Sequence, residues 1–224
     1  MVITAGYGFL KIKRVIIRKT FCSYTPLTVS FSLEMTKAEL RKIYLEKQAA
    51  LSPAERNKKS EQIFERFFAE FDLSKICFLH CFLPIQRTNE IDTKPIFERI
   101  WRDFPNIQTL VPRVNFETNE LENLRFTFET ELVQNQWSIH EPSHNELVET
   151  GKIDLVLVPL LCFDRQGHRA GYGKGFYDRF LKNCREDCLK IGLSYFPPVG
   201  EISDAREFDV RLDFCITSER AWKF

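Results

Sequence analysis

The residue types best suited to chemistry gather in one short segment that ends at Asp178. Glycines alternate there with cations and aromatic residues, and a carboxylate follows: Arg169, Gly171, Gly173, Lys174, Gly175 and Asp178. Glycine tolerates positive φ and lets a ligand approach the backbone, so main-chain N–H groups of such a segment can surround an anion. The cations add positive charge at the rim, and the carboxylate suits a divalent metal ion. The segment predicts a phosphate-binding site with a metal ion.

The spacing excludes two common phosphate-binding motifs. A Walker P-loop would need glycine at His168 and serine or threonine at Gly175. The dinucleotide fingerprint would need glycine at Phe176. The remaining alternative to a phosphate site is a glycine-rich turn that carries only solvated charges.

The segment follows the most apolar stretch of the chain, residues 153–161, whose sequence is IDLVLVPLL. A stretch that is apolar on both faces is typical of a central strand covered by helices on both sides. In open α/β sheets, ligands bind outside the carboxyl ends of the strands. The glycine segment is therefore expected at the place where such a fold binds its ligand.

Apolar periodicity and capping residues predict the surrounding elements. Further strands are expected near 76–83, 108–114, 124–129, 189–194 and 212–217, and helices near 37–50, 53–71, 93–104 and 176–183. Capping boxes that start at Thr36 and Ser52 begin the first two helices. Because strands alternate with helices, we predict a single α/β domain with a mostly parallel sheet flanked by helices in Rossmann-like layers.

Length and charge limit the class of protein. A chain of 224 residues with 44% hydrophobic content fits one domain with its own core. The formal net charge is +1, and the excess of basic residues falls in the first 34 residues, so the remainder has no cationic field for nucleic acid or an anionic membrane. No run approaches the about 20 apolar residues that cross a membrane.

Residues 1–34 lack apolar periodicity and precede both Met35 and the first helix cap. We expect a poorly ordered N-terminal extension there, with a transit peptide as the alternative, and a folded domain over residues 35–224. The seven cysteines lack metal-ligand spacing and are odd in number, which indicates free thiols in a reducing cytoplasm.

Several motifs occur in a fixed order along residues 35–224. They are Lys37-Ala-Glu-Leu-Arg41, Glu90-Ile-Asp-Thr93, Ile139-His-Glu141-Pro142, the glycine segment over residues 167–178, and Asp209-Val-Arg-Leu-Asp213. Together they resemble the motifs of the 5-formyltetrahydrofolate cyclo-ligase family, whose signature is G-x-R-[LM]-G-x-G-x-G-[YF]-Y-D. Two positions depart from the usual pattern: Ala170 replaces Leu or Met, and Phe176 replaces a Tyr.

The resemblance implies a fold, a reaction and cofactors. The topology would be the one that this family shares with sugar-phosphate isomerases and CoA transferases. The reaction would convert 5-formyltetrahydrofolate to 5,10-methenyltetrahydrofolate, with ATP as co-substrate and Mg²⁺ as cofactor. The formyl oxygen would be phosphorylated, and ring closure would release phosphate. We expect a monomer whose partners are these small molecules, not nucleic acid or membranes.

The resemblance also implies site residues. Contacts to ATP would come from Lys37, Arg41, Arg169, Ala170, Gly171, Tyr172, Gly173, Lys174, Gly175, Phe176 and Tyr177. Contacts to the folate would come from Leu83, Glu90, Trp137, Tyr172, Gly173, Lys174, Gly175 and Phe176. Lys174 and Tyr177 would be catalytic. Asp178 and Asp213 would hold the metal ion, with Asp209 as the alternative to Asp213.

Each assignment has a plainer alternative. Lys37 and Arg41 lie one helical turn apart, so both can point at one polyphosphate. Taken alone they more often form a solvated basic face, and only the matched family pattern favours the polyphosphate. Glu90 can bind the pterin or simply precede a helix, where an acid is favourable. Leu83 and Trp137 can line a pocket or belong to the core. At the level of function, the alternatives are a metal-free isomerase without ATP turnover and a non-catalytic nucleotide-binding module.

Overall fold

The computed structural model describes residues 34–135, 139–143, 146–206 and 209–224. The helices are α1 (Lys37–Ala50), α2 (Pro53–Glu70), α3 (Lys94–Asp103) and α4 (Phe176–Lys182), with 3-10 turns η1 (Gln86–Thr88) and η2 (Thr150–Lys152). The strands are β1 (Glu34–Met35), β2 (Phe78–Cys81), β3 (Gln108–Asn115), β4 (Glu120–Arg125), β5 (Leu132–Gln134), β6 (His140–Pro142), β7 (Leu155–Pro159), β8 (Cys162–Phe163), β9 (Arg169–Ala170), β10 (Leu189–Leu193), β11 (Glu201–Ile202), β12 (Phe214–Ile216) and β13 (Ala221–Lys223).

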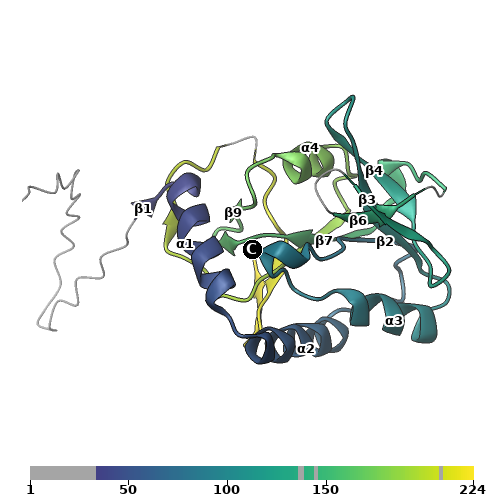
Figure 1. Cartoon of the computed structure of the whole chain (residues 1–224), viewed down its shortest axis with the longest axis horizontal. Helices are drawn as coiled ribbons and strands as arrows, with labels where there is room; N and C mark the ends of the chain where they lie inside the picture. The colour runs from purple at the N-terminus through teal and green to yellow at the C-terminus, as the bar shows by residue number, and fades with distance from the viewer. Residues whose placement is uncertain (1–33, 136–138, 144–145, 207–208) are drawn as a thin grey trace, which may run out of the picture. The chain divides into compact units, whose positions relative to one another are not determined.

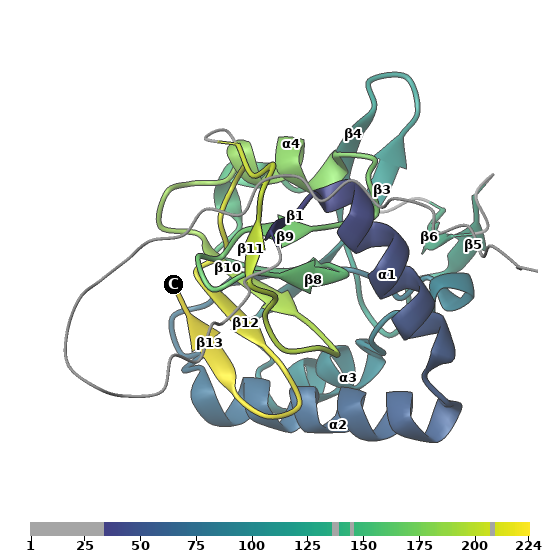
Figure 2. The ribbon, with the colours of Figure 1, turned by 90° about the vertical axis from the view of Figure 1, so that its left-hand side faces the viewer.

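The main sheet has seven strands in the order β13-β12-β10-β7-β2-β3-β4. Figure 1 labels β7, β2, β3 and β4, and Figure 2 labels β10, β12 and β13. Its five inner strands pair in parallel, and the two edge strands, β4 and β13, pair antiparallel with their neighbours. The predicted α/β fold with a mostly parallel sheet is confirmed. Strand β7 is the central one and lies within the apolar stretch 153–161.

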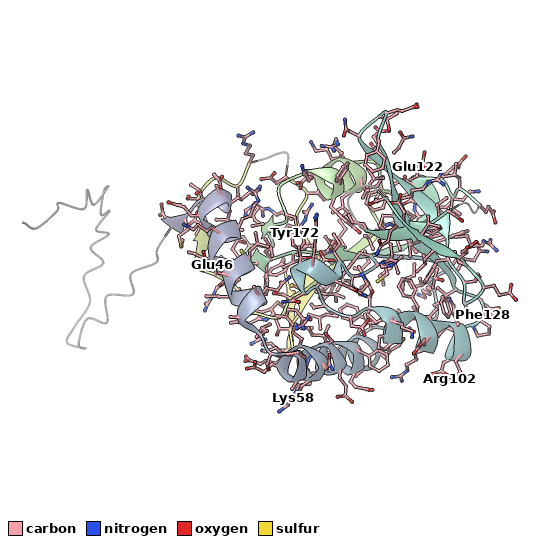
Figure 3. The ribbon with its side chains drawn as sticks, in the orientation of Figure 1. Glu46, Lys58, Arg102, Glu122, Phe128 and Tyr172 are labelled. Carbon is pink, nitrogen blue, oxygen red and sulfur yellow. The ribbon has the colours of Figure 1, made fainter. Side chains whose placement is uncertain are left out.

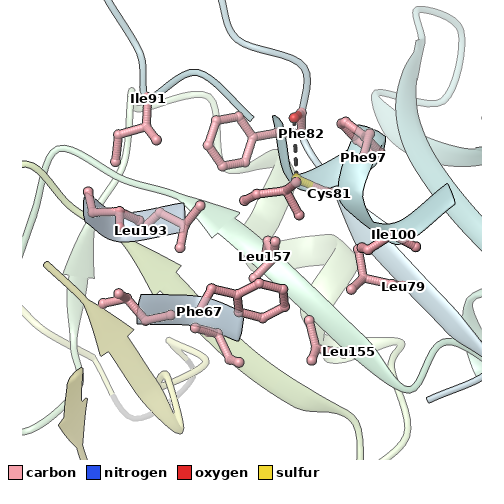
Figure 4. Packing of buried hydrophobic residues seen from close by; sticks show 14 of the residues in the cluster. Phe67, Leu79, Cys81, Phe82, Ile91, Phe97, Ile100, Leu155, Leu157 and Leu193 are labelled. Atoms are coloured by element: carbon pink, nitrogen blue, oxygen red, sulfur yellow. Dashed lines mark hydrogen bonds between the residues drawn. The ribbon is translucent and has the colours of Figure 1, made fainter. Parts of the chain in front are cut away.

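Helices cover both faces of this sheet (Figures 1 and 2). On one face α2 and α3 pack their apolar stripes against alternate strand residues. Phe67 of α2 lies beside Leu155 and Leu157, and Phe97 of α3 belongs to the same cluster (Figure 4). On the other face Phe180 of α4 packs in a cluster with Val156 and Val158. Because consecutive side chains of a strand point to opposite faces, a strand covered on both sides must be apolar throughout, as the sequence indicated.

Both predicted capping boxes are present: Thr36 and Ser52 accept hydrogen bonds from the backbone of Glu39 and Glu55, whose side chains reach back. Thr93 precedes α3, but its hydroxyl donates to Phe82 O at 2.7 Å and does not cap the helix.

One strand of the main sheet was predicted with the wrong bounds, and one was missed. A strand was expected over 124–129, whereas β4 begins at residue 120, because it pairs as a hairpin with β3 and the turn fixes its register. Strand β13 was not expected at all. It is a three-residue edge strand that returns antiparallel along β12, and so short a stretch carries little periodicity.

Between β7 and α4 the chain forms a short antiparallel hairpin, β8 and β9, and then the glycine segment. Helix α1 packs over this hairpin, with Leu40 and Tyr44 against Cys162 and Ala170 (Figure 2). Strand β1 pairs in parallel with β11, so Glu34 and Met35 belong to the fold, while residues 1–33 lie outside the described residues. No helix in the described part of the chain is long and apolar enough to span a membrane.

Candidate active site

The glycine segment adopts the backbone that its composition predicts at two positions. Gly173 has φ of 93° and Gly175 has φ of 70°, in the left-handed region that glycine enters without strain. A Cβ atom at Gly173 would stand 3.4 Å from Arg41 Nε, so glycine also lets α1 come close. Gly171 is not among the residues with positive φ. Its carbonyl accepts a hydrogen bond from Arg41 Nε at 2.9 Å, which fixes the segment to α1.

Two cations of α1 therefore face this region, although each meets a different partner. Arg41 binds the backbone of Gly171, and Lys37 Nζ lies 2.5 Å from Asp209 Oδ2. Partial burial alone would raise the pKa of Asp209, but the hydrogen bonds from Lys37 and from Arg206 N–H, together with the charges of Lys37 and Arg169, outweigh burial and keep that pKa below its ordinary value. The motifs at the two ends of the chain thus meet at one place.

Arg169 lies behind the glycine segment and is buried. Its guanidinium donates to Val210 O and to Asp178 Oδ1, the latter at 2.7 Å. Burial lowers the pKa of Arg169, and the carboxylates of Asp178 and Asp209 act in the opposite direction. Asp178 remains 44% exposed, so it can accept a further cation beside Arg169. Lys37, Arg169, Asp178 and Asp209 form what we call the charged cluster.

Asp213 lies elsewhere. Its carboxylate accepts a hydrogen bond from the backbone N–H of Lys190 at 2.7 Å, and Lys190 Nζ stands 3.9 Å away. These contacts are at the start of β10 and β12, and no interaction in the described ranges joins Asp213 to the charged cluster. The structure brings Asp209 to Arg169, and not Asp213, so the alternative assignment of the second carboxylate fits the geometry better.

The side chains present could hold a magnesium ion only if a bound phosphate supplied further oxygen ligands. Among the described residues, no group of three or more His, Cys, Asp or Glu side chains could hold a metal ion. Mg²⁺ prefers six oxygen ligands and in nucleotide enzymes takes one or two carboxylates together with phosphates and water. Asp178 and Asp209 match that smaller donor set, provided that phosphate oxygens complete it.

Tyr172 turns inward from the glycine segment (Figure 3). Gln48 Nε2 donates to its hydroxyl at 3.1 Å and to Thr88 O at 2.6 Å. Tyr172 and Glu90 line one small cavity, and the Tyr172 hydroxyl lowers the pKa of the Glu90 carboxyl. Ile85 N–H donates to the Glu90 carboxylate, at 2.7 Å. Burial nevertheless raises the pKa of Glu90 to about 7, because these two groups do not compensate for lost water.

Glu90 also lines a large groove of about 1250 Å³. Its lining includes Leu83, Gln86, Trp101, Phe126, Phe128 and Tyr195. Figure 3 shows Phe128 and Arg102 at the end of the molecule away from α1. The aromatic wall and a few polar groups are typical of a site for a flat organic ligand, which needs roughly 300–1,000 Å³. The structure thus places Leu83 and Glu90 together in one groove, while Trp137 lies outside the described residues.

The remaining residues of the segment divide by exposure. Lys174 is exposed. Phe176 packs under Arg179, whose guanidinium carbon lies 5.1 Å from the centre of the Phe176 ring. Ala170 is buried beneath α1, so only its backbone can meet a ligand. The Tyr177 ring packs toward the core beside His80, and its buried hydroxyl has no hydrogen-bond partner among the described residues.

Gln48 is the site residue that sequence reasoning missed. It lies seven residues after Arg41, which places it on the same side of α1, and it is buried although polar. A glutamine on the face that carries Lys37 and Arg41 was the available signal. Without the position of Tyr172, however, no partner for Gln48 can be inferred from the sequence.

The comparisons with known proteins agree with this geometry. The model of the 5-formyltetrahydrofolate cyclo-ligase family matches residues 34–212, a range that ends one residue before Asp213. The mouse 5-formyltetrahydrofolate cyclo-ligase is 30% identical over 165 residues, which cover 70% of this chain and 77% of that protein. The Escherichia coli K12 protein of the same name is 27% identical over 182 residues, 80% of this chain and 98% of that protein.

Solved structures agree as well. The NMR structure of Aquifex aeolicus 5,10-methenyltetrahydrofolate synthetase has a TM-score of 0.72 and 30% identity, covering 84% of this chain and 93% of that one. The Mycoplasma pneumoniae 5,10-methenyltetrahydrofolate synthetase has a TM-score of 0.63 and 26% identity, covering 82% and 99%. With its fold, its motifs and most of its length matched in this way, the chain belongs to the 5-formyltetrahydrofolate cyclo-ligase family.

Proposed function

We propose that this chain catalyses the ATP-dependent cyclisation of 5-formyltetrahydrofolate to 5,10-methenyltetrahydrofolate, with release of ADP and phosphate. The names of its relatives support the folate reaction. The observation that carries the proposal is Tyr172, whose backbone belongs to the glycine segment and whose side chain lines one small cavity together with Glu90 of the groove. A phosphate at the segment would therefore lie next to a folate in the groove.

In this reaction the formyl oxygen attacks the γ-phosphorus of ATP, and the bond from that phosphorus to ADP breaks. The second folate nitrogen then attacks the activated formyl carbon, the ring closes, and phosphate leaves. Phosphoryl transfer of this kind needs positioning and neutralised charge more than covalent help from the protein. The reaction therefore needs a cationic site for the polyphosphate beside a groove for the pterin.

We assign the polyphosphate to the glycine segment, with Arg41 holding the segment and Lys37, Arg169 and Lys174 supplying positive charge. Mg²⁺, when bound, neutralises phosphate charge, and we assign Asp178 and Asp209 to it in place of Asp213. Tyr177 supports the start of α4 from the core side, so we assign it a positioning role and keep Lys174 as the catalytic cation.

Glu90 suits the pterin because it is held between two protonation states near neutral pH. A carboxyl with a pKa of about 7 can donate a hydrogen bond when neutral and accept one when ionised. The edge of a pterin offers both donors and acceptors, so this side chain can match it and then follow proton movements during ring closure.

We infer a cytoplasmic location from the thiols. The six cysteines of the described residues are all free, as expected where the compartment is reducing.

The direct test mixes the protein with ATP, Mg²⁺ and 5-formyltetrahydrofolate and follows absorbance in the methenyl-folate band. We expect absorbance to rise only when all components are present, with one ADP formed for each product. ATP binding without turnover would favour a nucleotide-binding module, and turnover of a sugar phosphate without ATP would favour an isomerase.

A matched pair of variants tests the assignment of α1. Arg41→Ala releases the Gly171 carbonyl, so the Michaelis constant for ATP should rise about tenfold, the effect of losing one hydrogen bond from a charged donor. Lys42→Ala removes the neighbouring, exposed cation and should leave that constant unchanged. Equal effects of the two changes would mean that α1 acts only through its general charge.

A further inference from the structure

The guanidinium of Arg179, in α4, joins the glycine segment to the turn of the β3–β4 hairpin. Its Nη2 and Nε donate to Asn119 O at 2.7 and 3.2 Å, and its Nη1 donates to Lys174 O at 3.4 Å. A Cβ atom at Gly175 would stand 3.0 Å from the same Nη1, so the guanidinium lies directly against the segment. None of the ion pairs among the described residues includes Arg179, so its polar partners are these carbonyl oxygens and not a carboxylate.

The hairpin turn that receives the guanidinium is itself held in place. Figures 1 and 2 show β4 beside α4, and the turn that leads into β4 is fixed by its own side chains. Asn115 Oδ1 accepts hydrogen bonds from Glu117 N–H at 3.0 Å and from Thr118 N–H at 3.1 Å. Asn119 has φ of 56°, a left-handed conformation that asparagine adopts more readily than most residues. An ordered turn therefore presents the Asn119 carbonyl.

The glycine segment needs such external support. Lys174 lies between the two glycines with positive φ. Because glycine has the widest choice of backbone conformations, a segment of this kind loses much conformational entropy when a ligand orders it. Arg41 holds one end of the segment through Gly171 O, at 2.9 Å. Arg179 holds the other end through Lys174 O, from a different element of the fold.

The bond to Lys174 O also sets the direction of a backbone donor. The C=O and N–H groups of one trans peptide point in opposite directions, and Lys174 O shares its peptide with Gly175 N–H. With the carbonyl held toward Arg179, Gly175 N–H points away from the guanidinium. A backbone N–H that is oriented in advance binds an anion at a smaller entropy cost than one that must first be ordered.

We propose that Arg179 is a positioning residue for the polyphosphate of ATP, an assignment that rests on the function proposed above. In this role the guanidinium does not itself bind phosphate. It joins the glycine segment to the β3–β4 hairpin, so that Lys174 and Gly175 N–H hold their positions before ATP binds. The hairpin, sixty residues earlier in the chain, thereby becomes part of the ATP site.

Hydrogen exchange of the free, full-length protein tests this link without any turnover. In Arg179→Ala the amides of residues 171–176 should exchange about fivefold faster, the effect of losing one exposed hydrogen bond, because the segment opens more often. Lys182→Ala removes a cation from the same helix and should leave this exchange unchanged. Urea unfolding should show similar global stability for both variants. Unchanged exchange over residues 171–176 in Arg179→Ala overturns the proposal.

Steady-state kinetics supply the second readout. Arg179→Ala should raise the Michaelis constant for ATP about fivefold and leave both the maximal rate and the Michaelis constant for the folate in place, since support of the free segment affects binding alone. Arg179→Lys keeps the charge but lacks the planar fork that spans two carbonyl groups, so it should recover only part of the loss. Full recovery in Arg179→Lys, or an equal effect of Lys182→Ala, would mean that only charge matters and overturns the proposal.

A double substitution tests whether the link runs through the hairpin. Asn115→Ala loosens the turn and should raise the Michaelis constant for ATP about twofold in the unchanged chain. In the Arg179→Ala background it should add nothing, because the turn then has no contact through which to act. Independent, multiplying effects of the two substitutions overturn the proposal. If no variant and not even the unchanged chain turns over ATP, the proposed function fails, and hydrogen exchange still decides whether Arg179 holds the segment.

Discussion

Carboxylates at the two ends of the sheet are held in opposite ways. At the start of β7, Asp154 accepts hydrogen bonds from Cys77 N–H and Phe78 N–H at 2.8 and 2.9 Å and pairs with Arg185. Partial burial acts against it, but Arg185 and these donors keep the pKa of Asp154 below its ordinary value. At the other end Glu90 has fewer donors and deeper burial, and its pKa is raised to about 7.

The difference separates two uses of one chemical group. A carboxylate that stays ionised and saturated with donors joins neighbouring strands, and Asp213 does the same for Lys190. A buried carboxyl that receives few hydrogen bonds costs free energy when it is ionised, and such groups are concentrated at functional sites. By this criterion the amino end of the sheet serves stability, and the carboxyl end, with Glu90 and the glycine segment, serves binding and chemistry.

The largest expected effect is on turnover, and it distinguishes Asp178 from Asp213. Asp178→Asn removes an anionic oxygen from the charged cluster, so turnover should fall by about a hundredfold or more, comparable to losing one electrostatic group at a reacting centre. Asp213→Asn should retain turnover within a fewfold and lower the free energy of unfolding by about 1 kcal/mol, because Lys190 N–H loses a charged acceptor. Steady-state kinetics and urea unfolding of both variants measure these outcomes. Inactive Asp213→Asn with normal stability would return Asp213 to the metal site.

Lys174 comes next, because it distinguishes catalysis from binding alone. If it meets charge that develops during phosphoryl transfer, Lys174→Ala should lower the maximal rate about ten- to a hundredfold, the worth of one charge-assisted hydrogen bond. A contact made equally to bound ATP would raise the Michaelis constant and leave the maximal rate alone. Varying both substrates separates the two outcomes, with exposed Lys58 on α2 as a control position.

How far the sequence predicts this molecule depends on how local each signal is. The capping boxes, the apolar stretch 153–161 and the glycine segment are local patterns, and the structure confirms their helices, central strand and turn. Strand β4 was predicted with shifted bounds and β13 was missed, because the bounds of an edge strand depend on its pairing with the neighbouring strand. Asp209 and Asp213 are four residues apart in one motif, and only the path of the chain shows which one meets Lys37. The role of Gln48 could be seen only once the structure showed that the Tyr172 side chain points inward to it.

The ionisation of Glu90 predicts how stability depends on pH. Its pKa in the fold, about 7, lies above the ordinary value of 4.5, so the fold favours the neutral carboxyl. The contribution is complete below pH 4.5 and is lost as the pH rises through 7, and it amounts to about 3 kcal/mol at most. Glu90→Gln keeps the shape without the charge, so its stability should decline less than that of the unchanged chain over this range. Urea unfolding at a series of pH values tests this, and parallel curves would show that Glu90 titrates normally.

The smallest expected effect concerns the link between the two halves of the site. Tyr172→Phe removes the hydroxyl that lowers the pKa of Glu90, so this change should move the Glu90-dependent midpoint of the stability curve to higher pH. It should also raise the Michaelis constant for the folate about fivefold, since a neutral hydrogen bond contributes about 1 kcal/mol.

Gln48→Ala is the matched control. It removes the donor to the same hydroxyl and to Thr88 O, so it should lower stability but leave the midpoint in place. If both variants move the midpoint equally, the polar residues around Tyr172 together, and not the Tyr172 hydroxyl alone, set the pKa of Glu90. If neither moves it, burial alone sets the pKa, and the glycine segment does not act on the groove through Tyr172.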